Sequence, residues 1–189
     1  MKLSAFKIII LTVFIGSNCI AQDLTINTIA DASTYQGDNI RNYGGETKLL
    51  IKNKKGSTVS RKVFIKFDLQ NSGLKKIKKA TLKLYCNDLE PSGDNPTKTG
   101  LLIDIYAIDD NWNENDITWK TAPKSTLKIQ SFEASTKKNW IEVDLTDYFK
   151  SNYPNLGKFS FMLSNNEGNG NLVEFTSKEG KNKPVLILE

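Results

Sequence analysis

The sequence predicts an all-β protein, a two-sheet antiparallel β-sandwich. Apolar and polar side chains alternate with a period of two in many short segments, which is typical of strands with one buried face. We find no long segment with the spacing of an amphipathic helix. Clusters of Gly, Asn, Ser and Pro separate the alternating segments and have the composition of turns. About ten short strands spaced in this way predict two antiparallel sheets packed face to face.

The clearest alternation lies at residues 62–69. One face of this segment carries Val63, Ile65, Phe67 and Leu69, so we expect a strand with a single buried side. The same pattern predicts strands at 80–86, 103–108, 140–145, 159–163 and 172–176, with shorter strands at 25–29, 48–52, 127–132 and 185–188. A single helical turn is expected at 146–150, with Thr146 as its N-cap.

Residues 1–21 have the composition of a secretory signal peptide. Lys2 and Lys7 precede an apolar run at residues 8–15, and small residues lead to Ala21, where we expect cleavage. The apolar run is shorter than the roughly 20 residues that a membrane-spanning helix needs. We therefore expect a secreted or cell-surface protein with no membrane insertion.

Residues 22–189 then predict a single β-sandwich domain. Cys19 would leave with the signal peptide, so Cys86 would have no partner for an internal disulfide. The apolar residues that alternate before Cys86 place it at a buried strand position, where a thiol acts as a small apolar group. The alternative is a lipid anchor at Cys19, although Asn18 is an unusual neighbour for such a site.

The chain contains no histidine. This excludes Ser-His-Asp and Cys-His catalysis, and it excludes zinc sites built on imidazole. Acid–base chemistry would depend on carboxylates, Lys, Arg or Tyr, and a metal site would have oxygen ligands, which favour calcium. We expect no catalytic residues and no required cofactor.

Charge is distributed unevenly along the chain. Residues 48–83 contain twelve basic residues and the single acid Asp68, whereas residues 84–119 contain eight acids and the single base Lys98. Such a polarised surface can hold an anionic partner without a high net charge.

Three sets of segments resemble one family. They comprise Asp31-Ala32 with 42–45 and 61–69; 80–85 with 112–119 and Ala122-Pro123; and Trp140 with 143–146, 175–179 and Pro184. The pattern Trp-x-Glu-x-x-Ile-Thr-Trp at 112–119, combined with Phe-x-Lys-Phe-Asp-Leu at 64–69, is quite specific. Together the segments resemble the DNRLRE-type domain, also classed as carbohydrate-binding module family 96. The resemblance implies a jelly-roll β-sandwich that binds polysaccharide, with alginate as the ligand and basic residues holding the uronate carboxylates.

An anionic glycan requires cations at the spacing of its sugars. Lys supplies a point charge, and Arg donates two hydrogen bonds to one carboxylate. The candidate ligand-binding residues are Arg41, Tyr43, Lys48, Lys52, Lys54, Arg61, Lys62, Lys66 and Lys83. The alternative is that the lysines only keep a sheet face soluble and discourage edge pairing.

Tryptophan side chains can also stack on sugar rings. The positions of Trp112, Trp119 and Trp140 inside the most patterned segments favour a packing role for all of them. Tyr35 and Tyr43 are better candidates for ligand contact.

Oxygen-bearing side chains alternate at residues 109–116, as they do in a calcium loop. Lys120 stands where an EF-hand has its bidentate Glu, so this segment is not an EF-hand. For a structural calcium ion elsewhere, the candidate ligands are Asp31 and Glu179, which lie inside the segments that resemble the family.

The sequence thus predicts a secreted, non-catalytic, monomeric module that binds an acidic polysaccharide and no nucleic acid. One alternative is a structural or adhesive domain of the cell envelope, with a protein or surface partner. Another is a small polysaccharide lyase with Tyr or Lys as base and Arg neutralising the uronate.

Overall fold

The computed structural model describes residues 23–92, 100–135, 138–153, 155 and 157–189. The predicted signal peptide and Cys19 lie outside these residues, so secretion and the choice of anchor stay predictions. None of the helices in the described ranges has the length and hydropathy needed to cross a bilayer.

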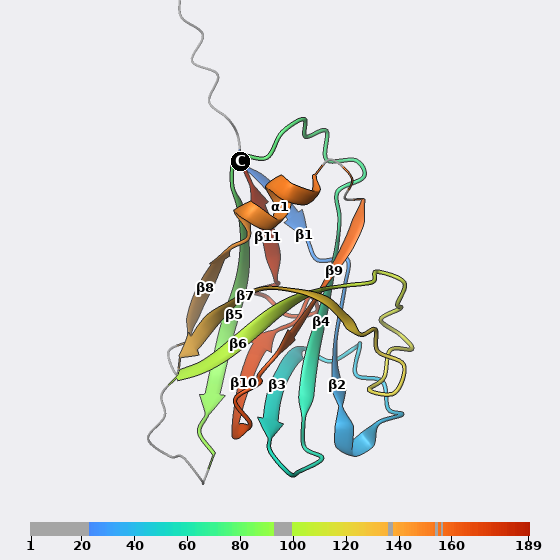
Figure 1. The fold of residues 1–189 in the computed structure, drawn as a ribbon, viewed down its shortest axis with the longest axis vertical. Coiled ribbons are helices and arrows are strands. Elements are labelled where there is room, and N and C mark those ends of the chain that lie inside the picture. Colours follow the sequence, from blue (N-terminus) through green and yellow to red (C-terminus); the bar gives the residue numbers. More distant parts are fainter. Residues whose placement is uncertain (1–22, 93–99, 136–137, 154, 156) are drawn as a thin grey trace, which may run out of the picture.

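The described residues form strands, one 3-10 turn and one short α-helix (Figure 1). In chain order these are β1 Leu24–Asn27, β2 Ala30–Tyr35, η1 Gln36–Asp38, β3 Lys48–Lys54, β4 Arg61–Asp68, β5 Ala80–Glu90, β6 Gly100–Ile108, β7 Ser125–Ser135, β8 Asn139–Asp144, α1 Thr146–Asn152, β9 Lys158–Ser164, β10 Asn169–Thr176 and β11 Val185–Leu188.

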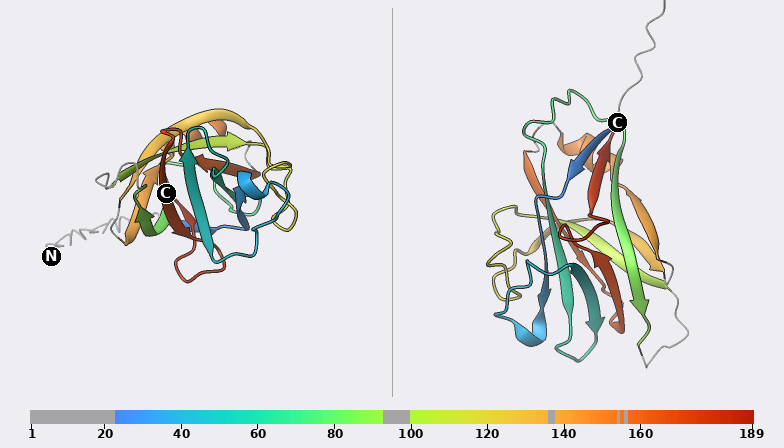
Figure 2. Two further views of the ribbon diagram at one scale, coloured as in Figure 1. Left: turned by 90° about the horizontal axis from the view of Figure 1, so that it is seen from below. Right: turned by 180° about the vertical axis from the view of Figure 1, so that it is seen from behind.

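The strands pair antiparallel in the order β1-β11-β5-β10-β3-β4-β9-β6-β7, with β2 added beside β4 and β8 beside β5. The predicted all-β, sandwich-like fold is confirmed, although its two parts belong to one continuous sheet. A single residue pair, Lys52 with Arg61, joins β3 to β4. Around this junction the sheet curls into a half-barrel, so its two parts face each other (Figures 1 and 2).

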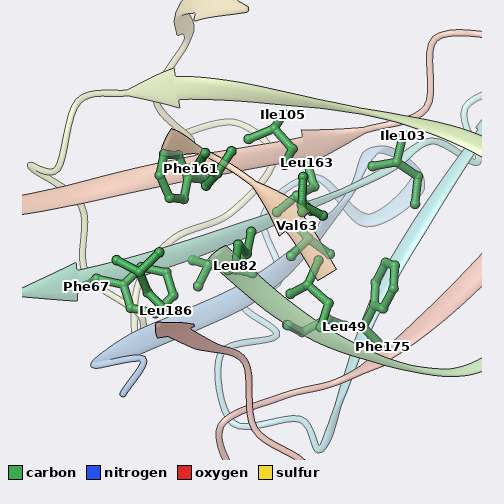
Figure 3. Close-up of a cluster of buried hydrophobic side chains, with 14 of the residues drawn as sticks. Leu49, Val63, Phe67, Leu82, Ile103, Ile105, Phe161, Leu163, Phe175 and Leu186 are labelled. Carbon is green, nitrogen blue, oxygen red and sulfur yellow. The ribbon is translucent and has the colours of Figure 1, made fainter. Parts of the chain in front are cut away.

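Apolar side chains from both parts of the sheet meet in one core (Figure 3). Leu82 and Phe175 contribute from β5 and β10, and Val63, Phe161 and Leu163 contribute from β4 and β9. None of these five side chains is more than 1% exposed. The alternating apolar positions in the sequence therefore point inward, as predicted.

β4 is buried on both faces, which the sequence pattern did not predict. Its inner face packs in the core, and on its outer face Phe64 is 0% and Lys66 is 8% exposed. The expectation of a single buried side is wrong for this strand because the loop of residues 109–124 passes over its outer face. A second apolar cluster forms there, including Ala32 and Met162 from the strands on either side.

The helix α1 forms where one helical turn was expected, but Thr146 is not its N-cap. Leu145 occupies the cap position, and no side chain caps the helix. The Thr146 hydroxyl instead accepts a hydrogen bond of 3.1 Å from the N–H of Ala80 at the start of β5. Phe149 anchors the helix in the core, with its ring edge-on to Phe159 at 5.2 Å.

Phe161→Ala tests the core directly. The Phe161 ring contacts Phe159 at 5.5 Å and Tyr148 at 5.7 Å between centroids, so its removal leaves a cavity among aromatic side chains. We expect the free energy of unfolding to fall by about 3–5 kcal/mol, measured by urea titration. Ile40→Ala is the control, because Ile40 is 73% exposed and should change stability by less than ~0.5 kcal/mol. Equal stability of the two variants would contradict this core assignment.

Candidate functional site

The loop of residues 109–124 is held against β4 by Trp112. Its ring packs edge-on to Phe64 with 6.1 Å between centroids, and its indole N–H donates a 2.9 Å hydrogen bond to Ser160 Oγ on β9. Trp112 is 9% exposed, so the predicted packing role is confirmed for this tryptophan. Trp119 is half-buried and Trp140 is 39% exposed, so both of these side chains are more accessible to solvent than Trp112.

Lys66 belongs to the same packing arrangement. Its ammonium group lies 4.5 Å from the centroid of the Trp112 ring and donates a hydrogen bond to the Trp112 carbonyl. Burial lowers the pKa of Lys66, and the negative charge of Asp110 opposes this effect. Because Lys66 is 8% exposed, the structure separates it from the surface cations with which it was predicted to act.

Beyond Trp112, the loop and the outer face of β4 enclose a surface groove of about 460 Å³. Thr34, Lys62, Phe64 and Met162 form its floor, and the loop lines the rest with Trp119, Lys120, Ala122, Pro123, Lys124 and Ser125. Three of these residues are lysines, and none is acidic. We call this hollow the Trp119 groove.

The groove is electropositive because its cations lack carboxylate partners. Within the described residues, Lys62, Lys120 and Lys124 form no ion pair. The Lys62 ammonium group lies 5.1 Å from the centroid of the Trp119 ring, and burial lowers its pKa. A partly dehydrated ammonium group facing an aromatic ring is stabilised by an incoming anion.

A stack of two arginines and two tyrosines lies near the junction of β3 and β4. The Arg61 guanidinium lies 4.0 Å from the centroid of the Tyr35 ring and 5.7 Å from that of Tyr43. Arg41 lies on Tyr43 at 4.9 Å. The structure therefore brings together three predicted ligand residues, Arg41, Tyr43 and Arg61, with Tyr35. We call this set the Arg–Tyr stack.

The Arg–Tyr stack and the Trp119 groove lie at the same end of the molecule. The Lys120 N–H donates to the carbonyl of Asn39 at 3.0 Å, which joins the loop before Arg41 to the loop that carries Trp119. The Asn42 amide donates to the carbonyls of Glu114 and Ile117 at 2.7 and 2.8 Å. These bonds fix the relative position of the two loops.

The remaining predicted cations lie elsewhere. Lys48 pairs with Glu174 at 2.8 Å, and Lys83 pairs with Glu142 at 2.8 Å beside Trp140 on β8. Both pairs are on the part of the sheet that contains β5 and β10.

Lys52 and Lys54 line a separate hollow of about 410 Å³, together with Glu90, Ser92 and Leu172. The nine predicted ligand residues therefore do not form one continuous surface.

Lys120 and Lys124 were missed as candidates. The available signal was their position in one short loop, on either side of Pro123 and directly after Trp119. Sequence reasoning assigned Trp119 to packing, and so it gave no reason to group these lysines with Lys62.

A cluster of carboxylates lies beside β2. Asp31 from β2, Glu114 from the loop and Glu179 after β10 converge, with Lys178 between the two glutamates. Burial raises the pKa of Asp31 to about 7. The two predicted metal ligands, Asp31 and Glu179, are thus neighbours, and Glu114 is a third carboxylate that sequence reasoning did not include.

Fold and groove together define the class of this protein as an all-β module with a cationic surface groove. The family model for carbohydrate-binding module family 96 matches residues 22–189, and the chain belongs to this family. The resemblance seen in the sequence is confirmed. The family consists of non-catalytic modules that bind carbohydrates. Membership therefore indicates a carbohydrate as the class of partner. No curated protein matches the sequence.

Lys66→Met tests the structural role of the buried ammonium group. Met fills a similar volume but leaves the Trp112 carbonyl without its hydrogen-bond donor. We expect the free energy of unfolding to fall by about 1–3 kcal/mol in urea titrations. Lys150→Met on the exposed side of α1 is the matched control and should be close to neutral. A neutral Lys66→Met variant would contradict the role assigned to Lys66.

Proposed function

We propose that the chain binds an acidic polysaccharide, such as the uronan alginate, in the Trp119 groove. The observation that carries this proposal is the grouping of Lys62, Lys120 and Lys124 in one groove whose lining contains no acidic residue. Removal of residues 1–21 as a signal peptide would bring the module into contact with such a polymer outside the cell.

The charge arrangement supports an anionic ligand. A lysine that only maintains solubility can form an ion pair with a carboxylate of the protein itself, as Lys48 and Lys83 do. The groove lysines have no such partner among the described residues. Uronate carboxylates would supply the missing negative charge, with each ammonium group acting as a point charge.

The lining also suits the apolar side of a sugar ring. Trp119, Ala122 and Pro123 line the loop side of the groove, above the buried Phe64 and Met162. Aromatic and aliphatic surfaces pack against the C–H face of a pyranose, while the lysines of the groove bind its carboxylate.

The Arg–Tyr stack offers a second point of contact for a chain that extends past the groove. Arg41 is exposed, and its guanidinium can donate two hydrogen bonds to one carboxylate. Tyr43 holds it by a cation–π contact, which reduces the freedom that Arg41 would lose on binding. A polymer with a carboxylate on every sugar offers a carboxylate to each of the two places.

The triple variant Lys62→Ala, Lys120→Ala, Lys124→Ala tests the groove. We expect its affinity for alginate to fall about tenfold, because three partly exposed charge pairs contribute ~0.2–1 kcal/mol each. Isothermal titration calorimetry or retardation in gels that contain alginate measures the change. Circular dichroism establishes that the variant is folded.

The matched control Lys48→Ala, Lys83→Ala, Lys150→Ala removes the same charge from outside the groove and should retain affinity. Raising the salt from 50 to 500 mM should weaken wild-type binding, because the Debye length falls well below about 10 Å. Equal losses in both triple variants would contradict the assignment of the groove. Unchanged binding in the groove variant would do the same. The affinity of Arg61→Ala for alginate measures the contribution of the Arg–Tyr stack separately from that of the groove.

A second candidate function is adhesion through the surface of β5 and β8. Trp140 is 39% exposed there and contacts Tyr85 at 5.4 Å between ring centroids. A protein or surface partner bound at this place would be lost in Trp140→Ala and retained in the groove variant. Binding to alginate that depends on Trp140 and not on the groove lysines would contradict the groove as the polysaccharide site.

We also propose that the module does not cleave its ligand. The groove contains no histidine, tyrosine or carboxylate, so only a lysine could act there as the base of a lyase, and a protonated ammonium group is not a base. Incubation of the protein with alginate should leave the ultraviolet absorbance of the unsaturated lyase product unchanged over hours. A steady rise that scales with protein concentration would contradict this prediction.

A further inference from the structure

Three carboxylates from distant parts of the chain meet beside the loop of residues 109–124. Asp31 lies on β2, Glu114 precedes Trp119 in the loop, and Glu179 follows β10. One oxygen of each carboxylate lies within 4.8 Å of an oxygen of the other two. A single metal ion could contact all three groups at that separation.

Asp31 carries a buried oxygen with no hydrogen-bond partner. Its side chain is 0% exposed, and Oδ2 accepts a 2.7 Å hydrogen bond from the N–H of Lys178. Oδ1 is inaccessible to solvent and has no partner. Buried carboxylate oxygens are otherwise paired with a donor or a cation, so this atom is an unused ligand position.

Lys178 supplies the one positive charge at the cluster among the described residues. Its ammonium group lies 3.0 Å from Glu114 Oε2 and also pairs with Glu179. It makes no hydrogen bond to Asp31 Oδ1. The Lys178 side chain is 23% exposed, so its flexible stem can turn toward solvent when a stronger cation arrives.

We propose that Asp31, Glu114 and Glu179 form a calcium-binding site in which the ion displaces the ammonium group of Lys178. All three ligand groups are hard oxygen donors, which select calcium or magnesium over zinc. Calcium accepts irregular coordination by six to eight oxygens, whereas magnesium needs a near-ideal octahedron. Water and the neighbouring Ser177 hydroxyl, which already contacts Glu179 at 2.9 Å, would complete the shell.

Calcium at this position would link β2, the loop of residues 109–124 and the segment after β10. The Asp31 N–H already donates to Glu114 Oε1 at 2.8 Å, and Asn42 donates to the Glu114 carbonyl. An ion that binds only the folded protein adds to its stability by mass action. The site therefore predicts a protein that is more stable with calcium than without it.

The first experiment uses the full chain after treatment with EDTA and contains no polysaccharide, so its result is independent of the proposed function. We expect added calcium chloride to raise the thermal unfolding temperature, and calorimetry to give one site per molecule. Magnesium should have a weaker effect. Glu114→Gln and Asp31→Asn should each lose the calcium effect, whereas Glu142→Gln on β8 should retain it. A wild-type protein that neither binds calcium nor gains stability at millimolar calcium would overturn the proposal.

The second experiment separates a calcium site from a simple salt-bridge cluster. In Lys178→Gln the competing ammonium group is gone, so calcium should bind at least several-fold more tightly than in the wild type. The control Lys181→Gln removes an exposed lysine from the same segment and should not change the affinity. If the cluster only links the segments by ion pairs, Lys178→Gln loses stability and calcium does not restore it. That outcome would also overturn the proposal.

Discussion

The burial of β4 on both faces is the constraint on which the rest of this structure depends. A strand of an ordinary sandwich packs one face in the core and leaves the other to solvent. Here the outer face of β4 carries Phe64 and Lys66. Trp112, from the loop of residues 109–124, packs over both side chains and shields them from solvent. Because the loop is fixed at Trp112, its two flanks are also fixed. The residues that follow Trp112 carry Glu114 and then Trp119, Lys120 and Lys124.

The lysines of this protein fall into three kinds with different energetics. Lys48 and Lys83 lie in ion pairs at the surface, where the net contribution of each pair is small. Lys66 is buried, and its charge is stabilised by a carbonyl and an aromatic face. Lys62 is half-buried without a carboxylate, and it therefore gains most from an external anion. Local environment, and not the density of basic residues along the chain, selects the groove as the binding surface we propose.

The groove and the carboxylate cluster are physically connected although they carry opposite charge. Both are built where the loop meets β2, and Asn42 bonds to the loop at Glu114 and again at Ile117. Gly44 is needed at this contact, because a Cβ atom there would lie 2.1 Å from the Glu114 carbonyl oxygen. Tight backbone packing of this kind holds the segment that carries both Glu114 and Trp119 in place.

The sequence by itself determined most of the strands, although not β2, together with the family and the residue types available for chemistry. Alternation with a period of two depends only on strand geometry, so β5, β9 and β10 were predictable from local pattern. Tertiary structure decided which face of β4 is covered and which lysines are paired, because both depend on contacts between segments far apart in the chain. Lys66 and Lys62 lie on the same face of one strand, yet one lies beneath Trp112 and the other opens into the groove. Only the path of the loop distinguishes them, and strand periodicity contains no information about that path.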